Sequence, residues 1–204
     1  MSNLYWNQRY AQKEYVYGET PNEYLKQKLK DIPAGSILFP CEGEGRNAVY
    51  ASKIGWKSTA FDQSIQGKNK AEILAKRKDV SINYSIFTTE EVDYELESFD
   101  ALALIFAHFS AEERRAYHQK ISSYLKRDGV LILEGFSKAH TEFQKTNLNA
   151  GGPKEVSMLF DLEELKADFE GFEFIEATQS EEKLNEGNGH IGIASVVRIY
   201  AVKK

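Results

Sequence analysis

Apolar and polar residues alternate along most of the chain in blocks that predict β-strands separated by helices. The apolar runs that predict strands span 37–39, 58–61, 81–84, 101–106 and 130–133. The helical patterns between and after them span 46–54, 67–77 and 111–126, and one more begins at Asp161. The run at 101–106 is apolar almost throughout, which is typical of a strand buried on both faces of a parallel sheet. This part of the chain therefore predicts an α/β domain.

The two ends of the chain depart from this alternation. Residues 1–19 are rich in aromatic and polar side chains and show no clean period. Thr20 and Pro21 then predict a helix start, with Thr20 as the capping residue and Pro21 in the first turn. Near the other end, two strand-like runs at 172–177 and 191–202 have no helix between them, so they predict an antiparallel pair.

Together these patterns predict a three-layer α/β sandwich in one domain over residues 1–204, with a mostly parallel sheet and an antiparallel finish. The net charge of −5 gives no basic footprint for nucleic acid. No apolar run approaches the roughly 18 residues that span a bilayer, and the N-terminus shows no signal peptide. The single cysteine, Cys41, excludes an internal disulfide. We expect a cytoplasmic protein that binds neither nucleic acid nor membranes and is a monomer or a weak homo-oligomer.

A glycine-containing segment follows the first predicted strand. Gly43 and Gly45 lie between that strand and a helix that begins at Arg46. Glycine lets a backbone pass close to a ligand, and a helix N-terminus offers unpaired N–H groups, so this layout indicates a nucleotide-cofactor site. Asp62 ends the second predicted strand, where a carboxylate accepts both hydroxyls of a ribose or, in the alternative interpretation, caps the next turn.

Two classes of cofactor fit the glycine segment. Gly43, Gly45 and Ala48 match the dinucleotide fingerprint, which predicts an NAD-dependent oxidoreductase. Glu42, however, places a negative charge where a pyrophosphate would bind. S-adenosylmethionine has no phosphate, and its amino-acid end carries an ammonium group that pairs with a carboxylate. Glu42 therefore favours S-adenosylmethionine, and the oxidoreductase stays as the alternative.

The chain resembles class I S-adenosylmethionine-dependent methyltransferases, especially a small bacterial group similar to the tellurite-resistance methyltransferases. The resemblance covers nearly the whole chain, and its motifs are specific through their order and spacing: YVYGETPN at 15–22, EGEGRN at 42–47, Asp62, IFAHF at 105–109, Glu113-Arg114, Asp128-Gly129, Gly151-Gly152-Pro153, and Glu186-Gly187 with His190. It implies a Rossmann-like methyltransferase fold with a seven-stranded sheet whose last strand is antiparallel.

The resemblance also implies cofactor contacts at the carboxyl ends of the strands. The residues that it assigns are Cys41, Glu42, Gly43 and Gly45 in the glycine segment, Asp62 at the ribose, Gln63, Thr88 and Thr89 at the adenine, and Phe106 and Ala107 as the floor. Phe39 and Cys41 stand where the family usually has an acidic residue and a glycine. This departure keeps a non-catalytic S-adenosylmethionine-binding protein as a further alternative.

Methyl transfer from a sulfonium depends mainly on positioning, and only a protic acceptor needs a base. The candidate catalytic residues are His108, just past the run at 101–106, and His190, in the loop between the last two strands. Glu186 precedes His190 by four residues, but the glycines between them oppose the helix that such a metal-ligand spacing requires, so we expect no metal site.

The aromatic N-terminal segment, residues 1–19, is expected to act as a lid over the cofactor, with extra core as the alternative interpretation. The residues predicted to contact the acceptor or to form the lid are Trp6, Arg9, Tyr10, Tyr17 and Glu186. The acceptor itself is expected to be a small molecule, recognised by the irregular segment 134–159.

Overall fold

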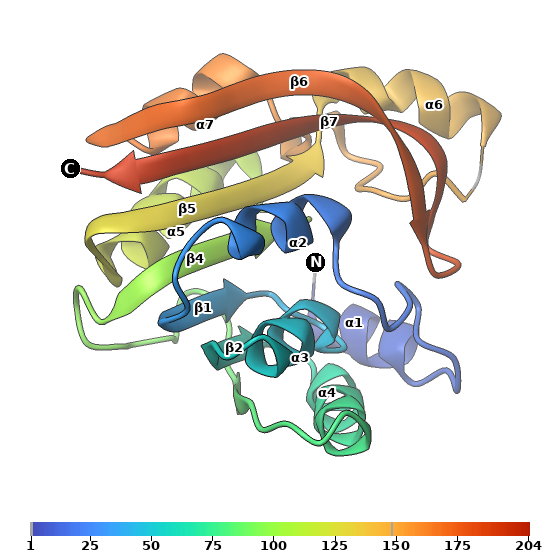
Figure 1. Cartoon of the computed structure of the whole chain (residues 1–204). Helices are drawn as coiled ribbons and strands as arrows, with labels where there is room; N and C mark the ends of the chain where they lie inside the picture. The colour runs from blue at the N-terminus through green and yellow to red at the C-terminus, as the bar shows by residue number, and fades with distance from the viewer. Residues whose placement is uncertain (1, 148) are drawn as a thin grey trace.

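In the computed structural model, seven strands form one sheet with the order β3-β2-β1-β4-β5-β7-β6 (Figure 1). The structure describes residues 2–147 and 149–204. The strands are β1 (Ser36–Pro40), β2 (Lys57–Asp62), β3 (Asn83–Ile86), β4 (Phe99–Ile105), β5 (Leu125–Phe136), β6 (Phe172–Glu186) and β7 (His190–Lys203). Strands β1 to β5 are parallel, whereas β7 is antiparallel to both of its neighbours. The predicted fold, with its antiparallel last strand, is confirmed.

Helices cover both faces of the sheet (Figure 1). The helices α2 (Glu23–Lys30), α3 (Arg46–Lys53) and α4 (Ile65–Arg77) lie on one face, and α5 (Ala111–Ser123) and α7 (Leu162–Asp168) lie on the other. Alternate residues of β1 belong to different cores, because successive side chains of a strand point to opposite faces. Ile37 and Phe39 pack on the α2–α4 side, and Leu38 packs on the α5–α7 side.

A buried ionic cluster joins α5 to α7. Asp168 accepts hydrogen bonds from Nε of Arg114 at 2.6 Å and from Nδ1 of His118 at 2.9 Å. Burial raises the pKa of Asp168, but the hydrogen bonds from His118 and Arg114 outweigh it and hold the pKa below its ordinary value. Arg114 therefore has a structural role on the face opposite α2.

Helix α2 begins two residues later than its predicted first turn, and the predicted cap at Thr20 is wrong. Asn22 is the N-cap, because its side chain accepts a hydrogen bond from the backbone N–H of Leu25 at 2.9 Å. The amide of Asn22 also donates to two buried carboxylates, on Glu134 and Glu186. These contacts come from distant parts of the chain, so the local sequence could not indicate them.

Other boundaries also differ from the predicted ones. Helix α4 starts at Ile65 because Ser64 caps it, through a hydrogen bond from the N–H of Gly67. Helix α5 keeps its predicted start and its cap at Ser110, but it ends at Ser123, and β5 begins at once. The motif Asp128-Gly129 lies inside β5, where Asp128 has a φ of 62°.

The two chain ends are more regular than the sequence indicated. The segment 1–19 contains helix α1 (Asn3–Tyr10). Strand β6 is far longer than its predicted run at 172–177, and β7 exceeds its predicted run by one residue at each end. As Figure 1 shows, the β6–β7 hairpin bends toward the N-terminal segment, and there the N–H of Gly189 donates to the carbonyl of Val16 at 3.0 Å.

Between β5 and α7 the chain forms short helical turns: η1 (Lys138–His140), α6 (Thr141–Thr146) and η2 (Val156–Met158). Within the described residues, no helix is long and apolar enough to cross a bilayer.

Candidate functional site

A cavity of about 830 Å³ lies at the carboxyl ends of the parallel strands. Its walls come from α1, from the loops that follow β1 to β5, and from the tip of the β6–β7 hairpin. Most residues that the sequence singled out line it: Trp6, Arg9, Tyr10, Tyr17, Cys41, Glu42, Asp62, Gln63, Thr88, Thr89, Phe106, Ala107, His108 and His190. Gly43, Gly45 and Glu186 are not part of the lining. One cavity thus gathers residues from the whole length of the chain.

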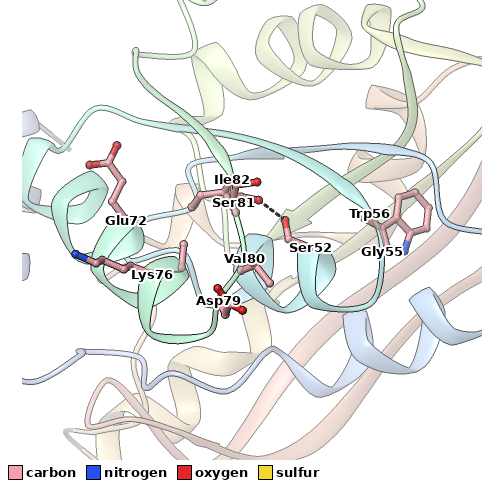
Figure 2. A pocket seen from close by; sticks show the side chains of 10 residues that line it. Ser52, Gly55, Trp56, Glu72, Lys76, Asp79, Val80, Ser81 and Ile82 are labelled. Atoms are coloured by element: carbon pink, nitrogen blue, oxygen red, sulfur yellow. Dashed lines mark hydrogen bonds between the residues drawn. The ribbon is translucent and has the colours of Figure 1, made fainter.

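A second hollow lies at the opposite edge of the sheet, where β2 and β3 begin (Figure 2). Ser52, Trp56, Glu72 and Lys76 are among its lining residues, and Ser52 donates a hydrogen bond to the carbonyl of Ser81 at 3.0 Å. None of the predicted site residues lies there.

The glycine segment is shaped as much by packing as by the cavity. Gly45 has a φ of 84°, and a Cβ at this position would overlap the side chain of Ala71 on α4. A Cβ on Gly43 would lie 2.6 Å from the hydroxyl of Tyr10. These two glycines therefore allow α4 and α1 to pack closely around the segment, beside the cavity.

Glu42 is held at the N-terminus of α3. Its Oε1 accepts hydrogen bonds from the backbone N–H groups of Asn47 and Ala48, both at 2.8 Å. Gly45 is the N-cap residue and has no side chain, so Glu42 supplies the capping oxygen instead. Burial raises the pKa of Glu42 to about 7, although these N–H groups lower it. Glu42 forms no ion pair with any residue that the structure describes, and its carboxyl lines the cavity. The positive charge of the nearby Arg46 also lowers its pKa.

Asp62 lies on the cavity wall at the end of β2. Its Oδ1 accepts a hydrogen bond from the N–H of Ser64 at 2.9 Å, and its Oδ2 accepts one from the N–H of Gly43 at 3.1 Å. Burial raises its pKa to about 6. The carboxyl therefore stabilises the next turn, as one interpretation predicted. Because each carboxylate oxygen accepts more than one hydrogen bond, Asp62 is also able to bind hydroxyl groups.

The N-terminal segment covers one side of the cavity. The rings of Trp6 and Tyr10 stack with centroids 5.4 Å apart, and Nε of Arg9 donates to the hydroxyl of Tyr17 at 3.1 Å. The N–H of Val16 donates to Glu44 in the glycine segment at 2.8 Å. The segment is thus fixed between the glycine segment and the hairpin tip.

Sequence comparison finds similarity to methyltransferases. Residues 41–133 match the family model for a methyltransferase domain. A curated relative, glycine/sarcosine N-methyltransferase from Aphanothece halophytica, is 30% identical over 144 residues, which are 63% of this chain. The match spans 54% of the length of that relative.

Solved structures of methyltransferases share the fold. TehB from Haemophilus influenzae superposes with a TM-score of 0.71 at 18% identity, covering 98% of this chain and 66% of TehB. Magnesium protoporphyrin IX methyltransferase from Synechocystis, solved with bound SAH, has a TM-score of 0.69 at 12% identity, covering 89% of this chain and 83% of that chain. At such identities the likeness concerns the fold alone.

Two residues at the ends of β1 and β4 have unusual backbones. Cys41 and Phe106 have φ angles of 54° and 53°, a region that side chains other than glycine rarely adopt. Both line the cavity. Burial raises the pKa of the Cys41 thiol to about 12, and its sulfur lies 3.9 Å from Oγ1 of Thr89. The thiol is therefore not a nucleophile at neutral pH.

His108 has both ring nitrogens engaged. Nδ1 lies 2.9 Å from the carbonyl of Met158, and Nε2 accepts the N–H of Phe136 at 3.1 Å. This arrangement places the proton on Nδ1. Burial lowers the pKa of His108 to about 3. The ring has no free lone pair for a substrate, although His108 lines the cavity.

His190 forms a side-chain hydrogen bond through one ring nitrogen only, among the residues that the structure describes. Its Nδ1 lies 3.0 Å from Oε2 of Glu186, the residue opposite it at the end of the β6–β7 hairpin. Nη2 of Arg46 donates to the same oxygen at 2.8 Å. Burial raises the pKa of Glu186, but Arg46 and His190 outweigh this effect and lower the pKa to about 2, so Glu186 is ionised. Within the described residues, no group of three or more metal-ligating side chains is placed to hold a metal.

The sequence did not indicate the polar network behind this pair. The amide of Asn22 donates to Oε1 of Glu134 at 2.6 Å and to Oε1 of Glu186 at 3.0 Å. Arg198 on β7 pairs with Oε2 of Glu134 at 2.5 Å. Asn22 and Arg46 lie within the motifs YVYGETPN and EGEGRN, but only the fold brings these motifs to the hairpin.

Proposed function

We propose that this protein transfers the methyl group of S-adenosylmethionine to a small-molecule acceptor. The observation that carries the proposal is the carboxyl of Glu42, which lines the cavity and forms no ion pair with a residue that the structure describes. When bound, the cofactor supplies an electrophilic methyl group on a sulfonium. The match to the methyltransferase family model and the SAH bound to the similar Synechocystis structure support this choice of cofactor.

The cavity residues fit S-adenosylmethionine better than a dinucleotide. In this proposal Glu42 binds the ammonium group and Asp62 accepts the ribose hydroxyls, with Gln63, Thr88 and Thr89 beside the adenine. The carboxyls of Glu42 and Asp62, which both line the cavity, would repel a pyrophosphate. Phe106 and Ala107 form the floor in this proposal.

The acceptor side of the site lies between the N-terminal segment and the hairpin. We assign the lid to residues 1–19, in which Trp6, Arg9, Tyr10 and Tyr17 line the cavity. A cavity of about 830 Å³ has the size of a small-molecule site. The name of the curated relative, a glycine/sarcosine N-methyltransferase, also agrees with a small acceptor.

Isothermal titration with SAH, the demethylated cofactor, tests the proposal directly. We expect saturable binding of SAH and none of NADH, which fluorescence titration detects. NADH binding without SAH binding would favour the oxidoreductase. SAH binding without methyl transfer to any thiol, amine, phenol, selenite or tellurite would favour the non-catalytic alternative.

The substitution Glu42→Gln separates the role of the charge from that of the cap. Glutamine keeps an oxygen for the N–H groups of α3 but loses the negative charge. We expect SAH affinity to fall about 10- to 100-fold, which is the typical contribution of a hydrogen bond between charged groups. Binding of 5′-methylthioadenosine, which lacks the ammonium group, should stay unchanged. Equal loss for both ligands would show that Glu42 acts only through the fold.

A further inference from the structure

His190 and Glu186 form a carboxylate–imidazole pair behind the cavity wall. The two side chains are 5% and 10% exposed, and Nδ1 of His190 lies 3.0 Å from Oε2 of Glu186. An ionised carboxylate only accepts hydrogen bonds, so Nδ1 carries the proton and Nε2 carries the lone pair. Nε2 forms no hydrogen bond to any residue in 2–147 or 149–204, and His190 lines the cavity. A base for the acceptor is thus available at this wall.

Two further residues fix the position and charge of Glu186. Arg46, at the start of α3, pairs with Oε2 at 2.8 Å, and Asn22, the N-cap of α2, donates to Oε1 at 3.0 Å. The carboxylate therefore has partners on three different elements. An imidazole oriented by a fixed carboxylate is a recurring arrangement for a general base.

The surroundings keep the imidazole of His190 dry and neutral. The rings of Tyr17, Phe106 and Phe136 lie with centroids 4.5, 4.5 and 5.0 Å from it. Burial lowers the pKa of His190, although the hydrogen bond that His190 donates to Glu186 opposes this effect. The charged and titratable groups around His190 come from several elements: Glu186, Arg46, Arg9, Tyr17, His108 and His140. Of the three histidines in this group, His190 alone has a ring nitrogen without a hydrogen-bond partner among the described residues.

We propose that Nε2 of His190 removes a proton from the acceptor, so that the substrates are small molecules with a protonated nucleophile: a thiol, a hydroxyl or an amine. This inference rests on the proposed function. The acceptor atom forms a bond to the methyl carbon, and its proton passes to Nε2. The bond between that carbon and the sulfonium breaks, and its electron pair stays on sulfur. Glu186 is a positioning residue that keeps the proton of His190 on Nδ1.

Nitrogen-15 NMR of the four histidines tests the pair without any acceptor. The substitution His190→Gln identifies the signal of His190 by its loss. At about pH 7.5, above the ordinary histidine pKa, we expect His190 to be neutral with its proton on Nδ1, both free and with SAH. Glu186→Gln should move protons toward Nε2, whereas Glu182→Gln should not. Glu182 is the matched control, because it also lies on β6 but pairs with Arg198 away from the cavity lining. A wild-type His190 with its proton on Nε2, or a cationic one, would overturn the proposal.

Kinetics with thiols, phenols and amines gives the second test. For any acceptor that the wild type methylates, His190→Gln should lower kcat by about 100-fold or more, the typical contribution of a general base. The SAH affinity of His190→Gln should stay within about threefold of the wild-type value, since a change of 1.4 kcal/mol in binding free energy would be about tenfold. The wild-type rate should rise as the pH rises through the pKa of His190, and Glu186→Gln should move this profile. A rate for His190→Gln that stays near the wild-type value would overturn the proposal. Absence of SAH binding to the wild type would instead count against the proposed function.

Discussion

Replacing Asn22 with alanine removes the residue that joins α2 to the hairpin and to β5. The side chain caps α2 through the N–H of Leu25, and its amide donates to the buried carboxylates of Glu134 and Glu186. Loss of an N-cap typically costs about 1 kcal/mol, and loss of a hydrogen bond to a charged group costs about 1.5–3 kcal/mol. Arg198 and Arg46 still pair with the two carboxylates, which limits the cost of each lost bond. We therefore expect the free energy of unfolding to fall by about 3–5 kcal/mol.

Urea unfolding followed by circular dichroism measures this change. Since a domain of this kind is stable by about 5–15 kcal/mol, the midpoint should shift by a large fraction of its value. Asn185→Ala is the control, because Asn185 is exposed on β6. If Asn22→Ala lowers the free energy of unfolding by less than about 1 kcal/mol, the hydrogen bonds of the amide to the two carboxylates add no stability beyond that of the N-cap, and the argument is refuted.

The substitution Asn22→Asp tests whether a negative charge is tolerated at the same position. It places a third carboxyl beside Glu134 and Glu186, and like charges about 4 Å apart repel by about 4 kcal/mol at a partly buried site. The folded state then holds a proton more tightly, so a carboxyl pKa in the folded protein rises above its unfolded value. A raised carboxyl pKa means that stability is retained below the unfolded pKa and lost as the pH rises through the folded pKa. Asn22→Asp should therefore lose stability between about pH 4 and 7 relative to Asn22→Ala, and equal pH profiles would contradict this.

Other substitutions test packing, charge and reactivity. Gly45→Ala should lower the melting temperature more than Gly171→Ala: both glycines have a left-handed φ, but only a Cβ at Gly45 meets another residue. Asp168→Asn should cost about 3 kcal/mol at neutral pH, because two buried partners on α5, Arg114 and His118, lose the carboxylate that pairs with them. The depressed pKa of Asp168 makes that stability present above its unfolded pKa and lost in acid, so urea unfolding should show a smaller cost near about pH 3. Cys41, whose pKa is about 12, should react with iodoacetamide much more slowly in the native protein than after unfolding, and fast labelling of the native protein would contradict the raised pKa.

The sequence predicted the fold well because its signals were local. The run at 101–106 became the central strand β4, and α5 and α7 begin where the helical patterns predicted, with Ser110 and Asp161 as their caps. The start of α2 was predicted wrongly, since Asn22 gains more from distant carboxylates than Thr20 gains as a local cap. Capping signals are therefore reliable where no buried partner competes for the residue.

The sequence could predict the part of the cavity that is lined by residues at the ends of strands. Residues after β1, β2, β3 and β4 line it because parallel strands end at one edge of a sheet. Gly45 lies outside the lining, although the fingerprint singled it out, because its missing side chain serves the contact with Ala71. A glycine pattern thus indicates close approach without indicating whether a ligand or a helix approaches.

The pair of Glu186 and His190 shows how the same spacing has different meanings in different elements. Four residues apart on a helix, the two side chains would share one face, and the glycines between them excluded that arrangement. In a hairpin, a short turn at 187–189 places the residues on either side of it directly opposite each other. The glycines that oppose a helix therefore form the turn that brings Glu186 and His190 together. Gly187 has a φ of 58° at the tip, and Gly189 packs against Tyr17. The turn, the N-terminal segment and the base are consequently one structural unit, and a change in any of them should alter the orientation of His190.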